Sequence, residues 1–241
     1  MKYPKPAKYI ISAGLIYMSI LSASAATIFS DPFGGTADPL WSQDSGAWDA
    51  TGGVYRANSP STVGPFRYSS LPFDLTDFSV EMDINGFFNS AIMLRSDFNG
   101  GAYNGVMLVT GGQGGGGNGI YWHIWQNGTR TGILNHSGNL LASQTDFSLR
   151  IGVSGNTYSA FVNGSNSAAT TLTTNLFSSG KVALVQNNND SFQSFDNILI
   201  SDDVAVAPTP VPLPGTATFL SFGLLGTFAF SRRKRRHPKI N

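Results

Sequence analysis

Apolar and polar residues alternate along much of the central part of this chain. In the stretch FSVEMDI, the apolar residues Val80, Met82 and Ile84 fall on one face and the polar residues fall on the other. A period of two residues is typical of β-strands with one buried face. No stretch between residues 27 and 201 shows the helical period, so the pattern predicts short strands rather than helices.

Similar runs recur between turns that are rich in Gly, Asn and Asp, and they predict about ten or eleven strands. Gly155 and Asn156 separate two of the runs and form a favourable two-residue hairpin turn. We therefore predict one all-β domain over residues 27–203, a two-sheet antiparallel β-sandwich, or jelly roll. The predicted strands cover residues 52–58, 65–70, 78–84, 90–97, 104–111, 119–128, 148–154, 157–164, 181–187 and 194–201.

Composition and charge exclude several classes of function. The chain has no cysteine, which excludes disulfides, cysteine–zinc sites and thiol nucleophiles. Nine of the 15 basic residues lie near the two ends, whereas all 14 acidic residues lie between them. The central region is therefore acidic, and an acidic surface does not attract a phosphate backbone. We expect no nucleic-acid partner.

The N-terminus has the features of a secretory signal peptide. Lys2, Lys5 and Lys8 precede the apolar run YIISAGLIYMSIL, and small residues follow it. We predict a signal peptide over residues 1–25, cut by signal peptidase after Ala25 or one residue later. An uncleaved membrane anchor is the alternative, although the apolar run is short for a membrane span.

The C-terminus has the features of a membrane-spanning segment with a basic end. Residues 216–230 are apolar or small, and a helix of this length is slightly shorter than the hydrocarbon core of a bilayer. A basic cluster follows, which the positive-inside rule keeps in the cytoplasm. We predict a single transmembrane helix, preceded by an extended spacer over residues 204–210. The basic cluster consists of Arg232, Arg233, Lys234, Arg235 and Arg236.

This ending resembles the PEP-CTERM sorting signal of Gram-negative bacteria over residues 211–236. The signature stretch is Val211, Pro212, Leu213 and Pro214, in which Leu213 stands where most members have Glu. The resemblance implies processing by exosortase at the cell membrane, followed by release or display at the surface of a cell that makes exopolysaccharide. A plain C-terminal anchor is the alternative.

The central region resembles the laminin-G-like branch of the concanavalin A-like lectin/glucanase jelly rolls. The stretches that carry this likeness are FSDPFGGTADPLWSQDSGAWDATGGVYRA, AIMLRSD, GNTYSAFVNG and FSSGKVALVQNNNDSFQSFDNILIS. The resemblance implies a jelly roll, a fold that hosts lectins, hydrolases and adhesion modules.

A hydrolytic site needs two carboxyl groups at a defined separation. The related glucanases place three acidic residues on one strand, but here only Glu81 and Asp83 match, and Asn85 or Gly86 stands at the third position. Glu81 is the only glutamate, and no Ser/His/Asp arrangement can be argued. We therefore expect a protein that is not an enzyme, with a solvated strand face at Glu81; a divergent glycoside hydrolase stays an alternative.

A sugar site is the main candidate for binding. In GIYWHIWQN, the side chains of Tyr121, His123 and Trp125 share one face, which we place on the outer, concave sheet. Aromatic rings stack on sugars, and polar groups bond their hydroxyls, so Arg95 and Asp97 on a nearby strand are further candidates. The alternative is that the two aromatic residues pack under a loop.

Calcium is the one expected cofactor. Members of the resembled fold often hold structural Ca²⁺ between the first and last strands, and Asp31 and Asp196 match those two positions. Both residues equally suit turns beside Pro and Asn.

These features predict an exported, exosortase-processed surface or extracellular-matrix protein that binds polysaccharide. A purely structural or adhesive surface protein is the alternative.

Overall fold

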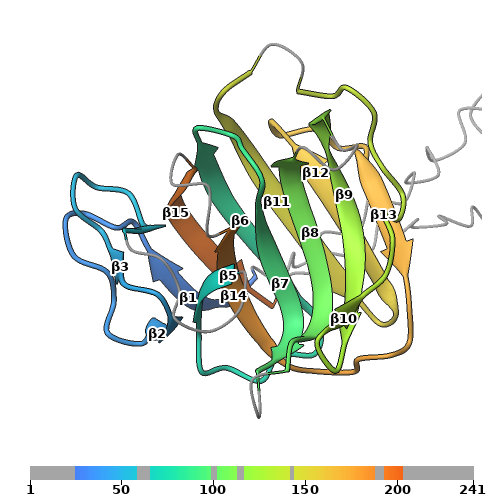
Figure 1. Cartoon of the computed structure of the whole chain (residues 1–241), viewed down its shortest axis with the longest axis horizontal. Coiled ribbons are helices and arrows are strands. Elements are labelled where there is room, and N and C mark those ends of the chain that lie inside the picture. Colours follow the sequence, from blue (N-terminus) through green and yellow to red (C-terminus); the bar gives the residue numbers. More distant parts are fainter. Residues whose placement is uncertain are drawn as a thin grey trace, which may run out of the picture.

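The computed structural model describes residues 25–58, 66–98, 102–112, 117–141, 144–187 and 193–202. Within these residues the regular elements are all strands, arranged as two antiparallel sheets packed face to face (Figure 1). This confirms the predicted β-sandwich. None of these residues belongs to a helix long and apolar enough to cross a membrane. The spacer, the sorting motif, the predicted transmembrane helix, the basic cluster and nearly all of the signal peptide lie outside the described residues.

The six-stranded sheet places the first and last strands side by side at one edge. Its strands, in spatial order, are β1 (Thr27–Asp31), β15 (Ser194–Ser201), β6 (Phe78–Asn85), β11 (Phe147–Ser154), β12 (Thr157–Val162) and β13 (Thr170–Thr173).

The seven-stranded sheet lies against it and carries the longest strands. Its strands, in spatial order, are β10 (Thr129–Arg130), β9 (Gly117–Gln126), β8 (Asn104–Gly112), β7 (Ser90–Asp97), β14 (Lys181–Asn187), β5 (Phe66–Ser70) and β2 (Ser42–Ser45). A small pair of strands, β3 (Trp48–Asp49) and β4 (Arg56–Ala57), completes the architecture.

Period-two alternation builds the main core between the sheets. Val80 and Ile84 of β6 are fully buried and belong to the same core cluster as Ile92 of β7 and Trp122 of β9. Each strand turns its other face outward, so Glu81 is exposed on β6. The predicted assignment of inner and outer faces is confirmed for β6 and β9.

The seven-stranded sheet is strongly curled, and its outer face is concave. Phe66 of β5 and Trp125 of β9 lie four strand spacings apart, about 19 Å in a flat sheet. Their ring centroids are nevertheless only 5.5 Å apart, in an edge-to-face contact. The outer face therefore closes over a second apolar cluster of its own, separate from the main core.

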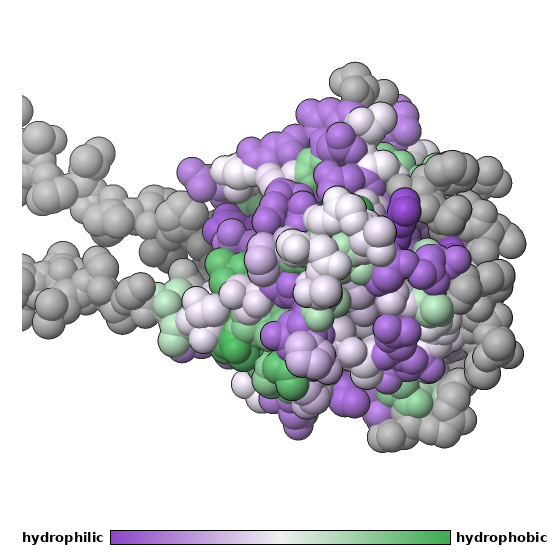
Figure 2. Space-filling view, turned by 90° about the vertical axis from the view of Figure 1, so that its left-hand side faces the viewer, coloured by the Kyte–Doolittle hydropathy of each residue, from purple (hydrophilic) through white to green (hydrophobic). Residues whose placement is uncertain are grey.

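The end of the molecule that carries β1, β2 and β3 is mostly hydrophilic (Figure 2). Apolar residues, drawn in green, gather at one side of this face among polar and pale residues.

Candidate functional site

The concave face of the seven-stranded sheet contains a pocket of about 350 Å³. This volume is at the lower end of the range for ligand sites, about 300–1,000 Å³. We call it the aromatic pocket. Apolar and aromatic side chains form much of its wall, and amide, hydroxyl, imidazole and guanidinium groups lie among them. Its lining consists of Phe66, Asn89, Ser90, Ala91, Met107, Val109, Tyr121, His123, Trp125, Arg130, Val185 and Asn187.

Strand β9 supplies three predicted site residues to this pocket because they alternate with core residues. Tyr121, His123 and Trp125 all line it. The structure thus brings these three together on the concave face, as their spacing predicted.

The two aromatic residues do not form an open stacking platform. Tyr121 is 4% exposed and Trp125 is 6% exposed. Trp125 packs edge-on against Phe66 and also contacts the ring of Tyr103. The rings therefore form the wall of a recess. They lie on the concave face, as the site prediction expected, and they are also packed, as the alternative expected.

The tight turn between β9 and β10 places Arg130 beside the pocket. Asn127 and Gly128 both have positive φ, 50° and 75°, as a two-residue hairpin turn of this type requires. The turn is held by the Asn127 N–H, which donates to Asn104 Oδ1 over 2.8 Å, and Arg130 pairs with Trp125 across the strands. Arg130 is exposed and lines the aromatic pocket.

His123 links this arginine to the sheet. Its Nδ1 lies 2.9 Å from the Gly132 carbonyl oxygen, which can only accept, and its Nε2 lies 3.0 Å from Arg130 Nη1, which can only donate. His123 must therefore be neutral, with the proton on Nδ1. Burial lowers the pKa of His123 below its usual value, and the charge of Arg130 acts in the same direction. Burial also raises the pKa of the Tyr121 hydroxyl.

The indole of Trp125 carries an unused donor at the pocket wall. Its Nε1 is buried and has no hydrogen-bond acceptor among the described residues. A buried N–H without a partner is costly, and an oxygen of a ligand is one way to satisfy it.

Arg95 is not part of this pocket. It is 2% exposed, and its guanidinium donates to the carbonyl oxygens of Thr76, Gly155 and Phe177. These bonds tie β7 to segments at the end of the other sheet, so Arg95 has a structural position. Asp97 is exposed at the end of β7, opposite Asn104, and does not line the pocket either.

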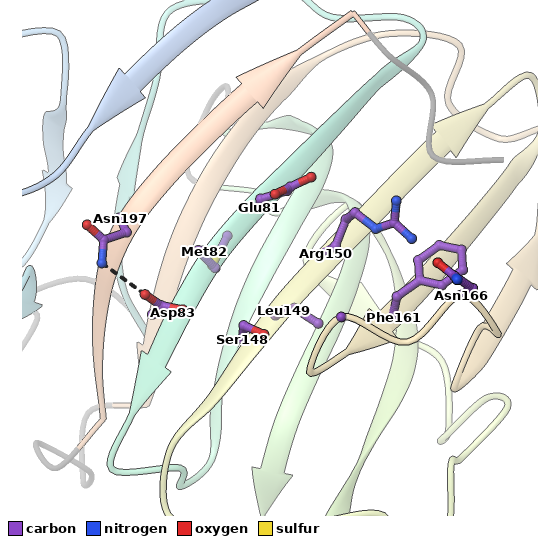
Figure 3. Close-up of a pocket in the computed structure, with 10 residues that line it drawn as sticks. Glu81, Met82, Asp83, Ser148, Leu149, Arg150, Phe161, Asn166 and Asn197 are labelled. Atoms are coloured by element: carbon purple, nitrogen blue, oxygen red, sulfur yellow. Dashed lines mark hydrogen bonds between the residues drawn. The ribbon is translucent and has the colours of Figure 1, made fainter. Parts of the chain in front are cut away.

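A second hollow, of about 450 Å³, lies on the outer face of the six-stranded sheet (Figure 3). We call it the polar cavity. Glu81 and Asp83 project into it from β6, and Asn197 Nδ2 donates to Asp83 Oδ2 over 2.9 Å. The guanidinium of Arg150 lies 4.4 Å from the centre of the Phe161 ring and covers it. The carboxylates considered for hydrolysis thus lie on the opposite side of the sandwich from the aromatic pocket.

Asp31 is held in a set of N–H donors. It is 4% exposed, and its carboxylate accepts from Phe33 N at 2.9 Å, Asp38 N at 2.7 Å and Trp41 Nε1 at 3.1 Å. Asp196 accepts from the N–H of Asn197. No group of three or more His, Asp or Glu side chains that could hold a metal occurs in the described part of the chain. Asp31 therefore acts as the anchor of a loop, and N–H donors are poor neighbours for a cation.

Sequence reasoning missed Arg130 as a site residue. The available signal was the Asn-Gly pair three residues earlier, because a hairpin turn there returns the chain beside Trp125. The approach of Phe66 from β5 had no such signal, since it depends on the curl of the whole sheet.

No protein-family model and no curated protein sequence matches this chain. Solved structures do share its fold. The carbohydrate-binding module CBM66 from Bacillus subtilis aligns with a TM-score of 0.55 and 17% identity, over 69% of this chain and 96% of the module. A Bacillus licheniformis β-glucanase aligns with a TM-score of 0.51 and 14% identity, over 76% of this chain and 99% of the glucanase.

The exoplasmic/lumenal domain of VIP36, in a form bound to Ca²⁺ and Man2, aligns with a TM-score of 0.53 and 12% identity, over 74% of this chain and 88% of that domain. Identities this low establish a shared jelly-roll fold and nothing finer. Since a binding module and a glucanase both have this fold, function has to be argued from the side chains.

Proposed function

We propose that this domain binds polysaccharide in the aromatic pocket and does not hydrolyse it. The observation that carries the proposal is a recess on the concave sheet in which aromatic walls meet hydrogen-bonding groups. Sugars present apolar C–H faces and a rim of hydroxyls, so this mixture of surfaces suits them. Trp125, which lines this pocket, carries a buried Nε1–H without an acceptor among the described residues, and this unused donor fits a ligand with oxygen acceptors.

A glycan array probed with the purified full-length chain tests this function. Wild-type protein should be retained on at least one glycan, and Tyr121→Leu should remove that retention because it deletes a ring from the pocket. Phe161→Leu is the matched control, since this equally buried ring lies on the opposite face of the sandwich. Circular dichroism should show both variants folded.

Two results would contradict the proposal. One is a wild-type chain that no glycan retains, which favours the structural or adhesive surface protein instead. The other is equal loss of retention in both variants.

Hydrolysis is a second candidate, favoured only by Glu81 and Asp83 in the polar cavity (Figure 3). If the chain is a glycoside hydrolase, it releases reducing sugar and Glu81→Gln abolishes the release. We expect no release from the wild-type chain.

A structural Ca²⁺ at Asp31 and Asp196 stays a prediction. The VIP36 domain was solved in a calcium-bound form, but the N–H donors around Asp31 favour a loop anchor here. If calcium binds, a chelator lowers the melting temperature of the wild-type chain. An unchanged melting temperature would remove calcium from the proposal.

The cellular part of the proposal rests on the two ends of the sequence. We propose export by signal peptidase cleavage, exosortase processing at the membrane and association with exopolysaccharide outside the cell. Mass spectrometry of the mature protein tests it: a C-terminus that still carries Arg232–Arg236 contradicts sorting by exosortase.

A further inference from the structure

We propose that the aromatic pocket selects an acidic sugar, whose carboxylate pairs with Arg130. This inference rests on the proposed function, because it names the class of polysaccharide that the same pocket takes. The starting observation is Arg130, which the local structure places and orients in a pocket whose described lining contains no acidic residue.

The backbone fixes where Arg130 begins. It stands opposite Trp125 in the β9–β10 pair, so both side chains leave the sheet on its concave face. The hairpin turn before it is held to the rest of the sheet by Asn127, and by Gly128 N–H, which donates to the Tyr103 carbonyl over 3.1 Å. The start of the side chain is therefore rigid, although its tip is exposed.

His123 fixes where the guanidinium points. Its unprotonated Nε2 accepts a hydrogen bond from Arg130 Nη1, and its Nδ1–H donates to the Gly132 carbonyl oxygen. A guanidinium has five N–H donors in one plane, so the remaining donors stay available beside the pocket. A pre-oriented planar fork suits a carboxylate, which can accept two parallel hydrogen bonds.

Among the described residues, no carboxylate neutralises Arg130 at the pocket. The described residues that line the aromatic pocket include no Asp or Glu, and the only ion pair within the described residues joins Arg95 to Asp77. The comparison with Arg150 on the other sheet is informative. Arg150 stands opposite Glu81, and its guanidinium lies over the Phe161 ring in a cavity that Asp83 also lines. The arginine in the aromatic pocket has no carboxylate beside it among the described residues, so this pocket favours an anionic ligand. The polar cavity already contains both an arginine and carboxylates, so it does not.

A uronate sugar supplies all the complementary groups on one ring. Its C–H face suits the aromatic wall, its hydroxyls suit the amide and hydroxyl groups, and its carboxylate suits Arg130. The central region of the chain is acidic as a whole, so this selectivity has to come from local contacts rather than from long-range attraction.

The test uses matched pairs of glycans with the purified full-length chain. Each pair consists of an oligouronate, built from galacturonate, glucuronate, mannuronate or guluronate, and its carboxyl-reduced counterpart, which has the same linkage without the charge. Calorimetric titration should show at least one oligouronate binding about tenfold or more tightly than its reduced form. Sodium acetate should not displace it, because the carboxylate alone lacks the sugar contacts.

Variants assign this preference to Arg130. Arg130→Gln should weaken binding of the oligouronate by about tenfold or more relative to its effect on the reduced glycan, so that the preference for the acidic form is lost. The affinity of Arg130→Lys for the oligouronate should lie between those of wild type and Arg130→Gln, since lysine keeps the positive charge but lacks the planar pair of N–H donors. His123→Leu should lower the ratio of the two affinities without abolishing binding, as expected of a positioning residue. Arg150→Gln is the matched control on the opposite face and should bind as wild type does.

The possible failures are distinguishable. If reduced and acidic glycans bind equally, or if Arg130→Gln keeps the preference, the acidic-sugar inference is wrong while polysaccharide binding stands. If Arg150→Gln loses the preference, the carboxylate is recognised on the other sheet and the inference is again wrong. If no glycan of either kind binds, the proposed function fails and this inference fails with it.

Discussion

Replacing Arg95 by Met tests whether one buried side chain holds the two sheets together at one end of the sandwich. Arg95 belongs to β7, but its guanidinium bonds to three carbonyl oxygens outside the seven-stranded sheet. Nε donates to Thr76 over 2.9 Å, and Nη1 donates to both Gly155 and Phe177 over 2.8 Å. The guanidinium also lies 5.4 Å from the centre of the Tyr158 ring.

The magnitude follows from these contacts. Each hydrogen bond to a charged group contributes about 1.5–3 kcal/mol, but bonds that share one side chain do not add. Met fills the space of the aliphatic stem and leaves three acceptors without the donor. A buried acceptor left without a donor costs about 1–3 kcal/mol, and because the costs at three acceptors do not simply add, we expect Arg95→Met to lose about 3–5 kcal/mol. The ion pair with Asp77 adds little, because the Asp77 side chain is 51% exposed.

Urea unfolding of the full-length chain measures this loss. Tryptophan fluorescence reports the opening of the core, because all four tryptophans are buried. At about 1–3 kcal/mol per molar urea, the midpoint should fall by about 1 M or more. Arg150→Met is the control, because it removes an arginine of the outer face and should cost no more than about 1 kcal/mol. If the two variants unfold at the same urea concentration, Arg95 does not stabilise the contact between the two sheets as we describe.

Three further predictions concern stability. Gly180→Ala should destabilise the chain by about 1–3 kcal/mol in thermal melts, because φ is 148° and a Cβ would lie 2.5 Å from the Arg95 carbonyl carbon; Gly34→Ala, with open space around it, should have little effect. Asp31→Ala should cost about 2 kcal/mol or more, because three N–H donors lose their acceptor; an unchanged melting temperature would exclude the anchoring role. Since burial depresses the folded-state pKa of His123 below 6.5, the unfolded chain binds more protons there, and stability falls as the pH drops below that value. His123→Gln should therefore lose less stability between about pH 7 and 5 than wild type, and equal losses would refute this assignment.

The local hydrophobic pattern predicted the strands well, because buried and exposed positions alternate along each strand and this alternation is visible in the sequence. The alternation of Val80 with Glu81, and of Trp122 with Tyr121, gave both the elements and their faces. The missed strands are short edge or loop pieces such as β10 and β13, which have few residues over which a period can be detected. Whether such short segments pair as strands depends on the neighbouring parts of the chain, so the local sequence gives little indication of it.

The site was predictable only in part, for a related reason. Arg95 follows the alternation of β7 as far as sequence can tell, but the structure has a bulge there and its φ is 46°. A bulge redirects the side chain, so the arginine enters the interior instead of the concave face. The recess itself arises where Phe66 approaches Trp125 across a curled sheet, and curl is a property of the assembled strands.

Our proposal of binding without hydrolysis rests on how acidic and aromatic side chains are distributed between the two faces of the sandwich. Hydrolysis needs two carboxyl groups on either side of a held glycosidic bond. The aromatic pocket has rings to hold a sugar, but the described residues of its lining include no acidic residue. The polar cavity has Glu81 and Asp83, but its one aromatic ring, Phe161, is covered by Arg150. The packed core, about 10 Å thick, separates the two faces. Glu81→Gln should therefore leave glycan retention at the wild-type level while Tyr121→Leu removes it, and a loss of retention in Glu81→Gln would place the sugar on the six-stranded sheet instead.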